Sequence, residues 1–134
     1  MNKRSRRAFL ASSVLATAAT VVAQPAIHMS SSSFVIHQVF FWLKTPGSVS
    51  DRQKLAEGLQ QLSGIPEIKQ LHVGFPASTE KREVVDNSWD VSELMFFHDL
   101  AAQKTYQDHP LHQDFIQKYS HLWEKVIVYD SLTI

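Results

Sequence analysis

Residues 34–44 carry hydrophobic side chains on both faces of a predicted β-strand. One alternation holds Val35, Val39, Phe41 and Leu43, and the other holds Phe34, Ile36, Phe40 and Trp42. β-Branched and aromatic residues favour strands, and Pro46-Gly47 closes the segment with a turn signal. A strand that is apolar on both faces has to be covered on both. The chain's own helices can cover one face, so the pattern favours a partner subunit over the other.

A helical repeat follows this strand. Leucines recur at helical spacing, at positions 55, 59 and 62. Ser50 is expected to cap the helix, with Gln53 three residues later as in a capping box. Gly64 and Pro66 are expected to end it.

Two shorter helical segments lie further along the chain. Asp99 is expected to cap a short helix that continues through Tyr106. Pro110 suits the first position of another helix, which runs to about Tyr119, because this position does not need the N–H that proline lacks. The cap of that helix is expected at one of the two preceding residues, Asp108 or His109.

Three more strands are predicted, at residues 67–75, 89–97 and 122–130. By strict alternation, Ile68 shares a face with His72. In the last strand, Val126 and Asp130 share one face, whereas Trp123 lies on the other. The order of elements predicts an α+β, ferredoxin-like β-α-β-β-α-β fold, with an antiparallel four-stranded sheet and the helices on one face.

The N-terminus has the composition of an export signal. Arg6-Arg7 precedes an apolar, alanine-rich stretch that reaches Ala23, as in a twin-arginine signal peptide, and this stretch is shorter than the ~20 residues of a membrane span. We expect residues 1–23 to be a cleaved signal, residues 24–33 a flexible leader and residues 34–134 the domain. The mature form is then periplasmic or secreted and not attached to a membrane; an uncleaved anchor is the alternative.

Removal of the signal makes the chain acidic. Four of the thirteen Lys and Arg residues lie in the signal, and all thirteen Asp and Glu residues follow it, which leaves a net charge of −4. Nucleic-acid binding is disfavoured, because it depends on clustered basic residues. The chain has no cysteine, which excludes disulfides and thiolate chemistry, and its four glycines form no nucleotide-binding loop, so no cofactor is expected.

His112 is the candidate base. As the third residue of a helix that starts at Pro110, its imidazole lies beside the positive end of the helix dipole, which favours the neutral ring. A neutral imidazole can accept a proton when an acceptor holds its other nitrogen. We expect Asp130, at the end of the last strand, to be that acceptor, and Tyr106 to donate a hydrogen bond to a substrate carbonyl.

The same residues also fit a purely structural interpretation. His112 can be a capping histidine, Tyr106 a core aromatic residue and Asp130 a strand-end turn residue. His37 is either a satisfied core histidine or part of a pocket. His109 and His112 are spaced for a shared metal ion, but the intervening proline separates their directions and catalytic zinc normally has three protein ligands, so no dedicated metal site is expected.

Four short motifs resemble one known family. They are His37-x-Val39-x-Phe41-x-Leu43-Lys44, Leu71-His72-Val73-Gly74, Tyr106-x-x-His109-Pro110-x-His112 and Trp123-Glu124-Lys125-Val126-x-Val128-x-Asp130. In this order, across residues 36–131, they resemble the stress-responsive A/B barrel (Dabb) domain family. The resemblance implies a ferredoxin-like α+β fold that forms a homodimer with the two sheets facing one another.

The resemblance also implies a site. A plant cyclase of this family closes a polyketide by aldol condensation without a cofactor; carried over by position, His112 and Tyr106 are catalytic and Asp130 holds the histidine. The expected ligand-binding residues are His37, Val39, Phe41, Phe115, Trp123, Val126 and Val128. The first helix has Leu55 and Gly58 where the cyclase puts aromatic residues into its pocket, so the substrate is not carried over.

We therefore expect an exported homodimer that binds a small apolar or aromatic molecule and can run cofactor-free acid–base chemistry of the cyclase or lyase type. Two alternatives stay open. One is a non-enzymatic stress-response or structural dimer with a packed interior. The other is a ferredoxin-like monooxygenase or haem-degrading enzyme.

Overall fold

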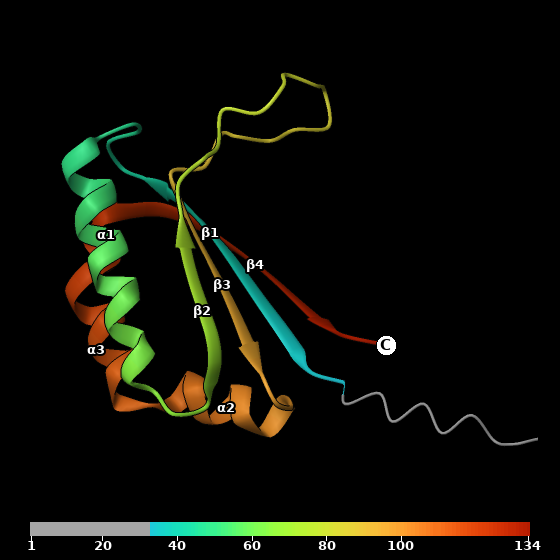
Figure 1. Cartoon of the computed structure of the whole chain (residues 1–134). Coiled ribbons are helices and arrows are strands. Elements are labelled where there is room, and N and C mark those ends of the chain that lie inside the picture. Colours follow the sequence, from blue (N-terminus) through green and yellow to red (C-terminus); the bar gives the residue numbers. More distant parts are fainter. Residues whose placement is uncertain (1–32) are drawn as a thin grey trace, which may run out of the picture. The chain divides into compact units, whose positions relative to one another are not determined.

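The computed structural model describes residues 33–134, which form one antiparallel sheet covered by helices on one face (Figure 1). The elements are β1 (Val35–Leu43), α1 (Val49–Gln61), β2 (Ile68–Gly74), β3 (Val91–Phe97), α2 (Leu100–Asp108), α3 (Pro110–Tyr119) and β4 (Trp123–Leu132). The strand order is β2-β3-β1-β4, which confirms the predicted ferredoxin-like arrangement. The predicted signal, residues 1–23, and all of the predicted leader except Ser33 lie outside the described residues.

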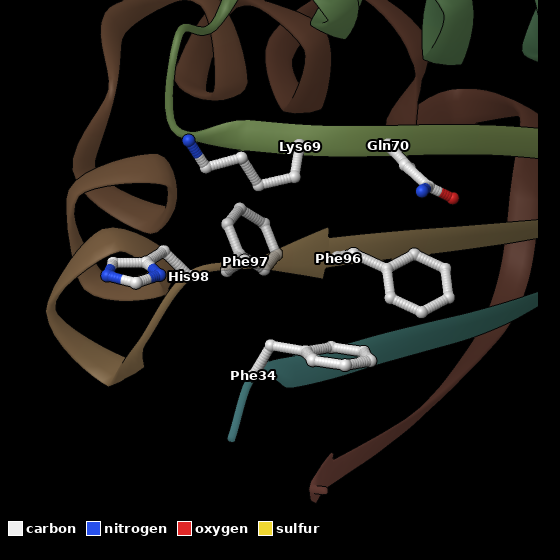
Figure 2. Close-up of a pocket in the computed structure, with 6 residues that line it drawn as sticks. All are labelled: Phe34, Lys69, Gln70, Phe96, Phe97 and His98. Carbon is white, nitrogen blue, oxygen red and sulfur yellow. The ribbon is translucent and has the colours of Figure 1, made fainter. Parts of the chain in front are cut away.

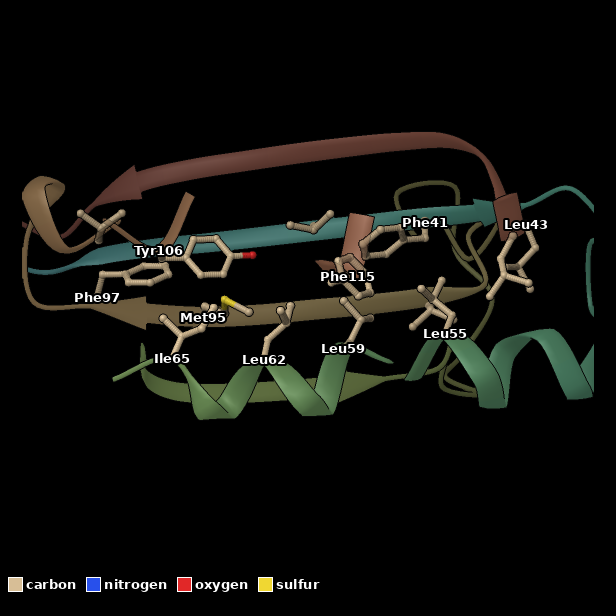
Figure 3. Close-up of a cluster of buried hydrophobic side chains, with 14 residues drawn as sticks. Phe41, Leu43, Leu55, Leu59, Leu62, Ile65, Met95, Phe97, Tyr106 and Phe115 are labelled. Atoms are coloured by element: carbon tan, nitrogen blue, oxygen red, sulfur yellow. The ribbon is translucent and has the colours of Figure 1, made fainter. Parts of the chain in front are cut away.

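The inner face of the sheet, which faces the helices, holds the core. Alternate residues of β1 and β3 are buried there, and they pack against leucines of α1 and against Phe115 and Leu122 (Figure 3). Two of these buried strand residues are polar, His37 and Glu93. Burial of polar groups is unfavourable unless they form hydrogen bonds, so two of them on an otherwise apolar face indicate a candidate functional site in this part of the core.

The outer face of the sheet is also apolar but carries no helix (Figure 1). It presents Phe34 just before β1, Ile36, Phe40 and Trp42 from β1, Leu94 and Phe96 from β3, and Ile127 and Tyr129 from β4. Near Trp42 and Tyr129 it is hollowed by a groove of about 530 Å³. A second hollow of about 220 Å³ lies at the opposite end, between Phe34, Phe96 and Lys69 (Figure 2). The alternation predicted for the first strand is thus observed.

Two of the three predicted helix starts are confirmed. Asp99 caps α2 by accepting a hydrogen bond from the backbone N–H of Ala102 at 2.8 Å, and Pro110 is the first residue of α3. His109 provides the cap of α3, through its side chain. The prediction of Ser50 as the cap of α1 is wrong. Ser48 caps that helix, because the turn before it brings the chain into the helix two residues earlier than the leucine repeat required.

Two face assignments made by strict alternation are wrong, and a strand irregularity explains each. The register between β1 and β4 shifts at Trp42/Leu43, so Trp123 lies opposite Leu43 on the inner face. The register between β2 and β3 shifts between Ile68 and Gln70, which turns Ile68 toward the core. An extra residue in one strand reverses the faces of the residues beyond it.

Asp90 fastens the turn between β1 and α1 to the start of β3. Its buried carboxylate accepts hydrogen bonds from the backbone N–H groups of Leu43 at 3.0 Å and Gly47 at 2.9 Å, and from the Arg52 guanidinium at 2.9 Å. Burial alone would raise the pKa of this carboxyl, but these bonds and the arginine charge outweigh it and lower the pKa. The ionised form therefore holds this end of the sheet together.

Candidate functional site

A cavity of about 290 Å³ lies between the inner face of the sheet and helices α2 and α3. All seven residues expected to bind ligand line it: His37, Val39, Phe41, Phe115, Trp123, Val126 and Val128. Tyr106 and His112 line it too. Asp130 does not belong to the lining. Val126 is 37% exposed and Val128 45% exposed, so the cavity is open toward β4.

One wall of the cavity is aromatic. Phe115 stacks on Trp123 with ring centroids 5.7 Å apart, and Trp123 in turn lies 5.1 Å from Phe41. Behind this wall Tyr119 stacks on Phe115 at 5.5 Å. The Tyr119 ring fits there because α1 has a glycine at position 58, where a Cβ atom would lie only 2.6 Å from the ring. This wall suits an apolar or aromatic ligand.

His112 lines this cavity, and one of its two ring nitrogens is held by a hydrogen bond. Its Nδ1 lies 3.0 Å from the carbonyl oxygen of Gln107, and a carbonyl can only accept, so Nδ1 carries the hydrogen. Burial lowers the pKa of His112, and the nearby His37 lowers it further, while the Gln107 carbonyl acts in the opposite direction. The ring is therefore neutral at neutral pH, with its lone pair on Nε2, which makes no hydrogen bond within the described residues.

The expected contact between Asp130 and His112 is wrong. Asp130 lies directly opposite His37 in the β1–β4 register, and its Oδ1 accepts a hydrogen bond of 2.6 Å from His37 Nδ1. His112 takes its orientation from the Gln107 backbone instead. Asp130 therefore acts on the site through His37.

Glu93 is a cavity residue that the sequence reasoning missed. It lies on the inner face of β3, is only 2% exposed and lines the cavity beside His37 and Tyr106. Burial raises the pKa of Glu93 to about 8, although the neighbouring Tyr106 hydroxyl acts to lower it. Its Oε1 has no hydrogen-bond partner. A carboxyl residue at a core position of an apolar strand was the signal that could have identified it.

Tyr106 provides a hydroxyl that stays protonated. Burial raises its pKa well above the ordinary tyrosine value, and the charge of Glu93 adds to this effect. Its ring lies 4.7 Å from the ring of His112 and 5.7 Å from that of His37, measured between centroids. Figure 3 shows its hydroxyl directed along the inner face of the sheet toward Phe41 and Phe115. The cavity thus holds a hydrogen-bond donor next to a neutral imidazole.

The described residues form no group of three side chains suited to a metal ion. His109 and His112 do not act as a pair, because the His109 ring accepts the backbone N–H of Leu111 at 3.1 Å as the cap of α3. Among residues 33–134, no helix is long and apolar enough to cross a membrane.

Residues 35–132 match the family described as the Stress responsive A/B Barrel Domain, Dabb. No curated protein is significantly similar in sequence.

Solved structures show the same fold at low identity. A Dabb family protein from Mesorhizobium loti is 22% identical, with a TM-score of 0.61 over 76% of this chain and 98% of that one. A hydroxynitrile lyase from Passiflora edulis is 21% identical, with a TM-score of 0.62 over 75% of this chain and 94% of that one. A dimeric ferredoxin-like protein of unknown function from Thermobifida fusca is 16% identical, with a TM-score of 0.62 over 75% and 92%. With the family match over residues 35–132, the chain belongs to the stress responsive A/B barrel domain (Dabb) family.

Proposed function

We propose that this protein binds a small apolar or aromatic carbonyl compound in the cavity and removes a proton from it without a cofactor. His112 is the base, and Tyr106 donates a hydrogen bond to the carbonyl oxygen. The observation that supports this most is the neutral His112 ring, whose Nδ1 is held by Gln107 and whose Nε2 is free. A positioned base of this kind contributes roughly 10² to 10⁴ in rate.

The reaction follows from the chemistry of the two ends of the cavity. The apolar wall around Phe115 and Trp123 takes the hydrocarbon part of the ligand, which leaves its carbonyl beside Tyr106. Nε2 of His112 takes a proton from the carbon next to the carbonyl, and the electron pair moves to the oxygen as an enolate. An aldol-type cyclisation starts from such a step. The similarity in fold to a hydroxynitrile lyase is consistent with lyase chemistry on this scaffold.

Deuterium exchange tests the proposal without knowledge of the natural substrate. Acetophenone in D₂O should exchange its methyl hydrogens faster with the protein than in buffer, as followed by proton NMR. His112→Ala should lower the enzymatic rate by roughly 10²-fold or more. His121→Ala is the control, because His121 is exposed and does not line the cavity. No exchange above buffer with the wild-type protein, or equal rates in wild type and His112→Ala, would contradict the proposal.

A packed, non-enzymatic interior is the less favoured function. It requires a filled core in which His112 and Asp130 bond to each other, whereas the described residues enclose an open cavity and Asp130 contacts His37. If acetophenone raised the melting temperature of the protein but did not exchange its methyl hydrogens, the cavity would bind a ligand without catalysing a reaction.

We also propose that the protein is a homodimer formed through the outer face of its sheet. This face is apolar and free of helices, and relatives from Thermobifida fusca and Bacteroides fragilis are described as dimeric. Burial of such a face is the strongest driving force for association that the fold offers. Size-exclusion chromatography with light scattering gives the mass directly; a stable monomer would contradict this proposal.

Export through the twin-arginine pathway is a third proposal. It rests on the sequence of residues 1–23, which lie outside the described part of the chain. Replacement of Arg6 and Arg7 by lysine should retain the protein in the cytoplasm, as judged by cell fractionation. Unchanged export of that variant would contradict the pathway.

A further inference from the structure

Glu93 is a buried polar group in the cavity to which the proposed reaction gives no role. Its carboxyl is almost fully enclosed, lines the cavity and leaves Oε1 without a partner. An unpaired buried polar atom destabilises the folded state, so its presence calls for a compensating role. The closest ring nitrogen, Nε2 of His37, lies 3.9 Å from Oε1, which is too long for a hydrogen bond.

The enclosure of Glu93 favours the neutral acid over the carboxylate and outweighs the Tyr106 hydroxyl, which acts in the opposite direction. β1 contributes His37, whose Nδ1 is already engaged by the partly exposed Asp130 of β4. α2 contributes the Tyr106 hydroxyl, α3 contributes the neutral His112, and β2 contributes Val73 opposite Glu93 in the sheet. The buried residues of α1 are apolar, and no lysine or arginine lines the cavity. No fixed cation therefore stabilises a negative charge here.

We infer that Glu93 is a second ligand-contacting residue, which donates a hydrogen bond from its neutral carboxyl group to the carbonyl oxygen of an uncharged ligand. Together with Tyr106 it forms a two-donor site for the oxygen that becomes negative during the reaction. A tyrosine beside a carboxylic acid kept neutral by an apolar environment is an effective way to stabilise an enolate oxygen. The inference rests on the proposed function and names its substrate class.

The proton balance of the step is simple. The C–H bond next to the carbonyl breaks, the proton forms an N–H bond at His112 Nε2, and the electron pair moves to the carbonyl oxygen. Glu93 and Tyr106 keep their protons and share them with that oxygen. The ligand begins uncharged and the pair of charges formed, imidazolium and enolate, sums to zero. No oxidant or reductant takes part.

The chemistry of the cavity also selects among ligands. A free carboxylate or a phosphate ester would enter a space without a cation and with Asp130 near its edge, so anions are excluded. An ammonium group would form no ion pair with Glu93, because that carboxyl group is uncharged. A neutral aromatic ketone or aldehyde satisfies both donors. We therefore expect acetophenone to bind at pH 7, and benzoate and benzylamine to bind at least tenfold more weakly.

The test combines one measurement on the wild-type protein with two variants. With ¹³C at the side-chain carboxyl carbons of the six glutamates, carbon NMR should show one resonance that titrates near pH 8, and Glu93→Gln should remove it. Glu93→Met, which has no donor, should lower acetophenone exchange by roughly 10²- to 10³-fold, as expected for loss of one donor to an enolate oxygen. Glu93→Gln keeps an N–H donor, so its exchange rate should fall less than that of Glu93→Met. The wild-type rate should fall above pH 8, where Glu93 loses its proton, and Glu93→Gln should abolish this fall.

The outcomes separate this inference from the proposed function. If wild-type exchange requires His112 but is the same in Glu93→Met, the base is confirmed and the role of Glu93 is wrong. A glutamate spectrum in which all six carboxyls titrate at ordinary acidic pH would also overturn the inference, whether or not the variants fold. Failure of the wild-type protein to exchange acetophenone while Glu93 titrates near pH 8 would contradict the proposed reaction and leave the neutral acid established.

Discussion

The protonation of Glu93 makes the stability of this fold depend on pH in an unusual direction. The folded chain holds the Glu93 proton up to about pH 8, whereas the unfolded chain releases it near its ordinary pKa of 4.5. Because the folded state binds the proton more tightly, the stabilisation is full below the unfolded pKa and is lost as pH rises toward the folded pKa. Glu93→Gln removes this titration and keeps the shape of the side chain.

The size of the effect follows from the two pKa values. Each unit of difference corresponds to about 1.4 kcal/mol, so the free energy of unfolding of the wild-type protein should fall by about 3 kcal/mol relative to Glu93→Gln between about pH 5 and pH 8. Urea unfolding of both proteins at these two pH values measures it. Glu80→Gln, an exposed glutamate, is the control and should show no such difference. A constant gap between wild type and Glu93→Gln, or one that changes with the opposite sign, would refute the buried neutral acid.

Three further predictions concern the stability of the fold and its association. Asp90→Ala should lower the free energy of unfolding by about 3 kcal/mol, since it leaves a guanidinium and two backbone N–H groups without their shared acceptor; urea unfolding near pH 7 measures this, and a loss below 1 kcal/mol would contradict it. Gly58→Ala should lower the free energy of unfolding by about 1–3 kcal/mol, because the new methyl group meets the Tyr119 ring. Tyr119→Leu in the same chain should recover part of the loss. Equal melting temperatures of wild type and Gly58→Ala would show that the ring moves freely. Ile36→Lys on the outer face should convert the proposed dimer to a monomer, as measured by light scattering. Gln60→Lys, on an exposed helix surface, is the control and should leave the dimer intact. A dimer in both variants would place the interface elsewhere.

The sequence determines the fold of this protein more completely than its site. The alternation in residues 34–44 and the helix starts at Asp99 and Pro110 are local signals, and the element order that they define leaves few topologies besides the observed one. Local signals fail where the chain is irregular. Trp123 lies on the inner face because the register shifts at the end of β1, and no period-two count can include such a shift.

The contacts of the site depend on which strands are neighbours. Asp130 lies near the end of the last strand, which continues to Leu132 beyond the predicted end, and its partner follows from the pairing of β4 with β1, which sets it opposite His37. The known strand order of ferredoxin-like sheets would have predicted that pairing. Glu93 belongs to none of the histidine-containing motifs, although a carboxyl between buried positions of a strand is rarer than a histidine there. The backbone contact of His112 with Gln107 depends on the turn between α2 and α3, which residue spacing alone does not define.

The state of the His112 ring is the most direct test of the account. Long-range proton–nitrogen NMR of the ¹⁵N-labelled protein at pH 7, with His112→Ala for assignment, distinguishes the two neutral tautomers from the imidazolium. We predict a neutral ring with hydrogen on Nδ1 and a bare Nε2 whose resonance shifts when acetophenone is added. A charged ring at pH 7, a hydrogen on Nε2, or a resonance that does not respond to the ketone would contradict the assignment of His112 as the base of this cavity.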